Sequence, residues 1–108
     1  MKGYITLIIS SIALLSFSQI TVTHYNSDWN SENSYDISTL KDCSTSHVMI
    51  CHNPELQEKH NIKSVPTIIV FNDSKEVARF EANILMKRTI EKKLIQKEID
   101  KIMLSKFE

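Results

Sequence analysis

The sequence predicts a single α/β domain, and three features between residues 53 and 82 carry that prediction. Residues 53–55 (NPE) form a helix start, with an N-cap side chain, a proline of fixed φ and an acid in the first turn. Residues 67–71 (TIIVF) are β-branched and aromatic, as in a fully buried strand. The turn residues 72–75 (NDSK) and the alternating residues 77–81 then predict a hairpin with one solvent-facing side. Helix and strands within one short stretch indicate the α/β class.

Length and composition limit the function classes. The chain has 108 residues, of which 42% are hydrophobic and 24% charged, so it forms one small domain. Lys and Arg number 13 and so do Asp and Glu, a balance that argues against nucleic acid or an acidic membrane surface as the partner. Gly3 is the only glycine. Turns with positive φ must therefore use Asn, Asp or Ser.

The first 18 residues have the pattern of a secretory signal peptide. Lys2 is followed by an uncharged apolar run, and Ser16 and Ser18 stand at the −3 and −1 positions of a cleavage site before Gln19. We therefore expect residues 1–18 to be removed and residues 19–108 to be exported to the periplasm or secreted, with no membrane span after cleavage. The alternative is that residues 1–18 are the first strand and helix of the domain, in a cytoplasmic protein.

The remaining elements follow from local patterns. Residues 20–25 and 47–51 are expected to be strands. A helix is predicted over residues 32–42 and another over 53–61, with Asn61 as its left-handed stop. The last helix is predicted over about residues 89–106 from a set of apolar positions close to one face. That set is Ile90, Leu94, Ile95, Ile99, Ile102, Met103 and Phe107.

The order of helix, buried strand and hairpin, with Val65-Pro66 just before the strand, resembles the C-terminal half of thioredoxin. The resemblance extends over about residues 20–102. It implies a thioredoxin-like three-layer α/β fold, with a central mixed sheet and helices on both faces. If residues 1–18 are removed, the fold is the minimal version without the first strand-helix unit. In this family the proline is cis and helps to form a groove where partner chains dock.

The redox motif of the family is missing. Thioredoxins carry Trp-Cys-x-x-Cys at the start of a helix, and the matching residues here are Trp29, Asn30 and Asn33. Dithiol exchange needs one thiolate to attack and a second thiol to resolve the mixed disulfide, and carboxamides do neither. The chain therefore resembles a degenerate thioredoxin without dithiol activity.

Other positions that support the family's reaction have also changed. His24 stands where the resemblance places the buried acid that assists proton transfer. Ser38 stands at the helix-kinking proline, and Ala82 at the glycine beside the groove. Of the residues that the resemblance places at the functional site of the family, Trp29, Val65 and Pro66 are still present.

The leading hypothesis is therefore a binding or scaffold module that needs no cofactor and whose protein or peptide partner is unknown. Its binding edge comprises Trp29, Asn30, Asn33, Val65 and Pro66. Two alternatives stay open. One is a monothiol thiol-disulfide oxidoreductase that uses Cys51, the only candidate catalytic thiol. The other is a structural partner that docks through its last helix. Trp29 itself could also serve packing alone.

The two cysteines, Cys43 and Cys51, are not expected to form a disulfide. They should lie at opposite ends of an extended segment, farther apart than a bridge allows. Cys51 precedes a helix start, which favours a thiolate.

No metal site is expected either. The four histidines, His24, His47, His52 and His60, match no zinc signature with Cys51. Cys51 and His52 are also adjacent, and neighbouring residues of an extended segment point to opposite faces.

Overall fold

The structure, a computed structural model, describes residues 19–82 and 92–106. The elements in chain order are β1 (Ile20–Asn26), the 3-10 helix η1 (Asp28–Asn33), β2 (Ser44–Met49), the 3-10 helix η2 (Ile50–His52), α2 (Pro54–Lys59), β3 (Thr67–Asn72), β4 (Lys75–Phe80) and α3 (Lys92–Ser105). Among these elements no helix is long and apolar enough to cross a bilayer.

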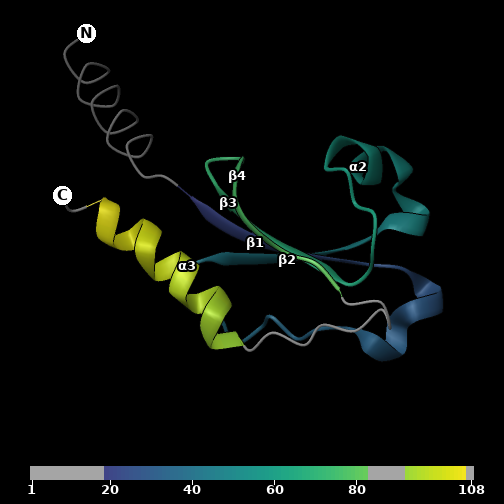
Figure 1. Cartoon of the computed structure of the whole chain (residues 1–108), viewed down its shortest axis with the longest axis horizontal. Helices are drawn as coiled ribbons and strands as arrows, with labels where there is room; N and C mark the ends of the chain where they lie inside the picture. The colour runs from purple at the N-terminus through teal and green to yellow at the C-terminus, as the bar shows by residue number, and fades with distance from the viewer. Residues whose placement is uncertain (1–18, 83–91, 107–108) are drawn as a thin grey trace, which may run out of the picture.

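The four strands form one mixed sheet in the order β2-β1-β3-β4. Strand β1 runs parallel to β2 and antiparallel to β3, and β4 continues the sheet antiparallel to β3. Figure 1 shows α3 along one face of the sheet and α2 on the other side. The predicted mixed sheet with helices on both faces is confirmed. Residues 1–18, on which the question of a further strand and helix depends, lie outside the described residues.

One face of the sheet packs against α3. Val22 of β1 and Ile68 of β3 are fully buried there, together with Ile95 and Ile99 of the helix. The predicted apolar face of the last helix is thus confirmed at its centre. Leu94 is the exception, because 40% of it is exposed. Residues 89–91 and 107 of the predicted helix lie outside the described residues.

The opposite face holds a second cluster, formed by Tyr25, Ile50, Ile62, Val65, Ile69 and Phe71. The His60 ring, at the end of α2, lies between two of these rings, with its centroid 5.8 Å from Tyr25 and 5.3 Å from Phe71. Arg79 of β4 holds the same end of the helix by donating hydrogen bonds to the carbonyl oxygens of His60 and Asn61, at 2.6 and 3.1 Å. These contacts fix α2 over the sheet.

The turns use the residues that the scarcity of glycine predicts. Asn61 has φ of 52° and ends α2 as expected. Asp73 and Ser74, between β3 and β4, have φ of 52° and 70°, and positive φ at both central residues is what a type I′ hairpin turn requires. Asn53 differs from expectation: its side chain makes no cap hydrogen bond to α2 and donates instead to the Met49 carbonyl oxygen.

The helix predicted over residues 32–42 is wrong. The 3-10 helix η1 ends at Asn33, and residues 34–43 form turns and irregular chain. Polar side chains compete for the backbone there, because Asp36 Oδ1 accepts from both the N–H and the hydroxyl of Ser38, at 2.9 and 2.6 Å. The apolar residues of this segment, Tyr35, Ile37 and Leu40, still pack on the α3 face, with Ile37 fully buried. Ser38 therefore lies in a turn and not in a helix.

The second strand is also displaced from its prediction. It was expected at residues 47–51 and is found at Ser44–Met49. Its parallel pairing with β1 ends where Met49 meets Asn26, the last residue of β1. With no partner strand beyond that point, the chain turns into η2. Cys51 and His52 consequently lie in a 3-10 turn and not in a strand.

Candidate functional site

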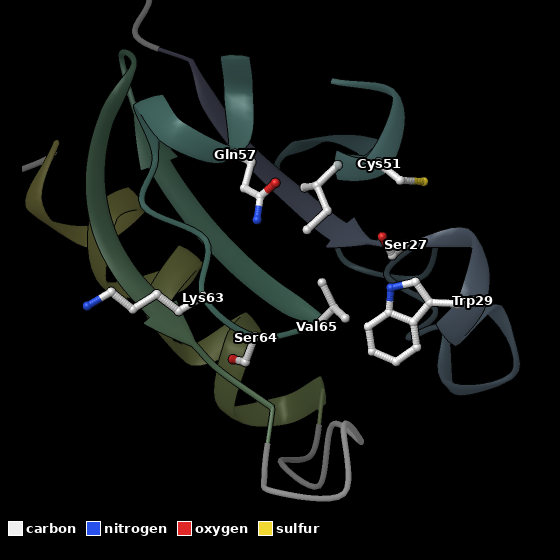
Figure 2. A pocket seen from close by; sticks show the side chains of 8 residues that line it. Ser27, Trp29, Cys51, Gln57, Lys63, Ser64 and Val65 are labelled. Carbon is white, nitrogen blue, oxygen red and sulfur yellow. The ribbon is translucent and has the colours of Figure 1, made fainter. Parts of the chain in front are cut away.

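The candidate site is a groove lined by residues from η1, η2, α2 and the loop before β3, segments that lie together at one end of the sheet (Figure 1). It has a volume of about 300 Å³. Its lining residues are Ser27, Trp29, Ile50, Cys51, Gln57, Lys63, Ser64 and Val65. Figure 2 shows the Gln57 amide pointing into the hollow from α2, with the Trp29 indole and the Val65 side chain at the opposite side. Apolar and polar groups thus converge on one concave surface.

The loop before β3 forms one wall of the groove. The Val65-Pro66 peptide bond is cis, as the resemblance implied, and both residues are buried. Thr67 stabilises the loop by donating a hydrogen bond from Oγ1 to the Ser64 carbonyl oxygen, at 2.7 Å. This hydrogen bond and the burial make the wall a fixed part of the fold.

Trp29 is the most exposed large apolar residue among those described. Its side chain lies in η1 at the rim of the groove and is 69% exposed. A packing role in the core is inconsistent with that exposure. An exposed tryptophan on a concave surface is instead the kind of residue that supplies a large share of the energy in protein interfaces.

Asn30 and Asn33, which the sequence resemblance aligns with the two thiols of thioredoxin, form a network of amide hydrogen bonds. Asn30 is only 4% exposed, and its Nδ2 donates to Asn26 Oδ1 and to the Val65 carbonyl oxygen, both at 3.2 Å. Asn33 Nδ2 donates to Asn30 Oδ1 at 2.8 Å. Asn26, which is fully buried, donates back to the Asn30 carbonyl oxygen at 3.1 Å. The Asn30 side chain thus ties η1 to the wall of the groove, and it does not face the solvent.

The Val65 carbonyl fixes the orientation of this network. A carbonyl oxygen can only accept, so the atom of Asn30 that faces it must be the NH₂ group. The Asn30 NH₂ group also donates to the Asn26 side chain, so the atom of Asn26 that faces it must be the oxygen Oδ1. The NH₂ group of Asn26 then faces the backbone carbonyl oxygen of Asn30 and donates to it. Each amide is placed where its donors and acceptors are matched. No reacting group stands at this point of the site.

His24 lies beneath the site and is 2% exposed. The Tyr35 backbone N–H donates to His24 Nε2 at 3.0 Å, so the proton of the neutral ring resides on Nδ1. That Nδ1–H donates to Nδ1 of His47, 3.1 Å away, and His47 must then carry its own proton on Nε2. Burial, together with the neighbouring His47, lowers the pKa of His24 to about 4. His24 is therefore neutral near pH 7.

Comparison with known proteins identifies the architecture. No family model matches the sequence, and no curated protein sequence matches it. Solved structures do. A single-residue mutant of thioredoxin from Halobacterium salinarum NRC-1 aligns with a TM-score of 0.63 and 15% identity, over 77% of this chain and 74% of that one. The fold is thioredoxin-like.

Two further structures agree. Thioredoxin 1 from Thermosipho africanus TCF52B aligns with a TM-score of 0.62 and 15% identity, over 82% of this chain and 99% of its own. A malaria parasite thioredoxin-2, described as a component of the protein secretion machinery, aligns with a TM-score of 0.60 and 21% identity, over 78% and 84% of the two chains. At these identities the likeness is one of fold alone. The thioredoxin-like architecture places Val65 and Pro66 beside η1, as the sequence resemblance implied.

Both cysteines of the thioredoxin-like domain are free, which confirms the expectation that they do not pair. Cys43 directly precedes β2 and is half-buried against the α3-side core. That burial, with the nearby Asp42 carboxylate, raises the pKa of the Cys43 thiol. Cys51 is exposed in η2, and Figure 2 shows its sulfur pointing outward, away from Gln57.

Sequence reasoning missed one cluster beside the groove. Asp28 Oδ2 and His52 Nε2 are 2.7 Å apart, and the ligating atoms of Asp28, Cys51 and His52 all lie within 4.8 Å of one another. The expectation that Cys51 and His52 point to opposite faces is wrong, because it assumed an extended segment and the residues occupy the turn η2. Asp28 reaches them from η1, which is 24 residues away in the sequence.

Proposed function

We propose that this domain is a binding module that holds an extended segment of a partner protein or peptide in the groove at Trp29, without dithiol redox activity. The observation that carries the proposal is the Asn30 amide network. It occupies the position of the attacking thiol with a buried group whose hydrogen bonds stabilise the groove. A site that has lost its reacting atoms and kept a rigid concave surface is suited to binding.

The groove itself indicates the kind of occupant. Ile50 and Val65 supply a buried apolar floor, and Trp29 adds an exposed aromatic surface at the rim. The Gln57 amide, which points into the hollow, can both donate to and accept from a peptide backbone (Figure 2). A volume of about 300 Å³ is at the small end of ligand pockets. These features favour a short extended peptide with one apolar side chain seated beside Trp29.

Binding is expected to depend on Trp29. A displayed library of unstructured peptides would be selected for binding to the purified domain. The affinities of the selected peptides would then be measured by calorimetry. Truncation of a central aromatic anchor costs about 2 kcal/mol or more, which corresponds to a loss of about 30-fold in affinity for Trp29→Ala. Leu104 of α3 provides a matched control, because it is 67% exposed against 69% for Trp29.

The control separates the groove from the last helix. Peptides that bind the wild type and Leu104→Ala equally and lose affinity for Trp29→Ala support docking in the groove. Peptides that lose affinity only for Leu104→Ala would place the interaction on α3 and favour the structural-partner alternative. Selection that yields no peptide dependent on Trp29 would contradict the proposal.

The alternative function is monothiol chemistry at Cys51. The observation that favours it is the position of this exposed thiol on the lining of the groove. No second thiol stands within bonding reach among the described residues, so turnover would require a small-molecule thiol to resolve the mixed disulfide. A disulfide-reduction assay with glutathione distinguishes the two functions. Activity in the wild type that disappears in Cys51→Ser would identify an enzyme, whereas the binding module shows none.

We also propose that the domain is exported after removal of residues 1–18. The backbone N–H of Gln19 donates to Asp73 Oδ1 at 2.8 Å. A new amino terminus at Gln19 would therefore meet a carboxylate. N-terminal sequencing of the native product should begin at Gln19, and a product that begins at Met1 or Lys2 would contradict export.

A further inference from the structure

We infer that Asp28, Cys51 and His52 form a Zn²⁺ site at the rim of the groove. The three residues come from two different 3-10 helices, η1 and η2, which the fold brings side by side. Their ligand atoms lie within 4.8 Å of one another, and Asp28 Oδ2 and His52 Nε2 are already in contact at 2.7 Å. The inference is independent of peptide binding, because it concerns the free domain.

The donor set identifies the metal. A thiolate, an imidazole nitrogen and a carboxylate oxygen are the three ligand types that Zn²⁺ takes in proteins. Mg²⁺ and Ca²⁺ require oxygen ligands and have little affinity for a thiolate. With Zn–S of about 2.3 Å and Zn–N of about 2.0 Å, the ligand atoms of a tetrahedral site are about 3.5 Å apart. The widest separation in the cluster must therefore shrink by up to about 1.3 Å, and the 2.7 Å contact between Asp28 and His52 must widen by about 0.8 Å.

The environment of the three side chains permits that contraction. Asp28 and His52 have side chains that are 63% and 65% exposed, and Cys51 is exposed as well. Rotation of exposed side chains about their χ angles moves the ligand atoms without disturbing the core. The contact between Asp28 and His52 would be replaced by a shared metal ion, at little cost, because exposed ion pairs contribute little to stability.

Three protein ligands leave one position open on a tetrahedral Zn²⁺. Water would fill that position in the free domain. Cys51 belongs both to this cluster and to the lining of the groove, so the open position lies close to where a partner would dock. The metal ligand is the thiolate, so a protonated Cys51 thiol releases its proton to solvent when Zn²⁺ binds.

Metal titration of the full domain tests the inference. Zn²⁺ added to the reduced protein should bind saturably at one ion per chain, with proton release. Co²⁺ in its place should produce the charge-transfer absorption of a cobalt-thiolate bond and quench Trp29, the only tryptophan, which adjoins Asp28. Loss of a ligand in Cys51→Ser, His52→Gln or Asp28→Asn should weaken Zn²⁺ binding by about tenfold or more. The absorption band should vanish only in Cys51→Ser.

Two matched variants serve as controls. Cys43→Ser removes the other thiol, and His47→Gln disrupts the His24–His47 pair, a second place where two imidazole nitrogens lie close together. Both should bind Zn²⁺ like the wild type. The inference is overturned if no saturable binding occurs, if Cys51→Ser and His52→Gln bind Zn²⁺ as tightly as the wild type, or if His47→Gln abolishes binding. Circular dichroism of each variant would establish that the exposed substitutions leave the fold intact.

Discussion

Lowering the pH from about 6.5 to about 4 is expected to cost the folded domain up to about 3 kcal/mol of stability through His24 alone. The unfolded chain binds a proton at His24 with a pKa near 6.5, whereas the folded domain does so only near 4. Between these values the unfolded state holds the extra proton. The contribution is therefore fully present above pH 6.5 and is lost as the pH falls toward 4.

The geometry around His24 gives the reason. A proton added at Nε2 would point at the Tyr35 N–H, which now donates to that nitrogen. A proton on His47 Nδ1 would in turn oppose the Nδ1–H of His24. Either event breaks a hydrogen bond in the chain that runs from Tyr35 through the two rings. That chain links β1 and β2 to the irregular segment beside η1.

Urea unfolding across this pH range measures the effect. His24→Gln, which does not titrate, should flatten the pH dependence by about 3 kcal/mol relative to the wild type. His60→Gln is the matched control, because burial lowers the pKa of His60 as well but its ring is only half-buried. The His60→Gln substitution should flatten the pH dependence of the unfolding free energy less than His24→Gln does. Identical pH dependence in the wild type and His24→Gln would contradict the prediction.

Asn30→Ala is expected to destabilise the domain by about 2–4 kcal/mol, because the substitution leaves two buried acceptors without the Asn30 donor. These acceptors are Asn26 Oδ1 and the Val65 carbonyl oxygen. Each buried polar group that loses its partner costs about 1–3 kcal/mol. The loss should also loosen the wall of the groove, since Asn30 is the residue that ties η1 to Val65.

Two further variants test whether the amide donors are responsible. Asn33→Ala removes a side chain that makes one of the network's hydrogen bonds and is only half-buried, so its cost should be about 1 kcal/mol or less. Asn30→Asp keeps the shape but replaces the NH₂ group with an oxygen that faces two acceptors. It should be at least as damaging as Asn30→Ala at neutral pH. If thermal and urea unfolding show Asn30→Asp to be as stable as the wild type, the donors are not essential.

Local sequence patterns predicted the elements that depend on neighbouring residues. The apolar run at residues 67–71, the hairpin turn at Asp73 and Ser74, and the left-handed stop at Asn61 all appear as expected. Side-chain branching, turn chemistry and tolerance of positive φ act within a few residues of the chain. The resemblance to thioredoxin, which rests on Val65-Pro66 and the elements around it, predicted a central mixed sheet with helices on both faces. The observed sheet confirms that prediction.

The predictions that failed depended on distant contacts. The segment at residues 34–43 carries a partial helical stripe, but polar side chains capture its backbone, and Ile37 and Leu40 pack on the sheet without a helix. Lys41 is held there by Gln96 of α3, which accepts from its N–H at 2.8 Å and donates to its carbonyl oxygen at 3.1 Å. No pattern within the segment reveals a partner 55 residues away.

By itself, the sequence determined that Asn30 and Asn33 stand at the positions that the resemblance aligns with the thiols of thioredoxin. What the replacements do was decided by the tertiary structure, in which Asn30 is buried and bonded to Val65. The same holds for the juxtaposition of Asp28 with Cys51 and His52, which arises because β2 ends with β1 and the chain then turns. Residue identity fixes which chemistry is possible, whereas packing between distant segments fixes which groups meet.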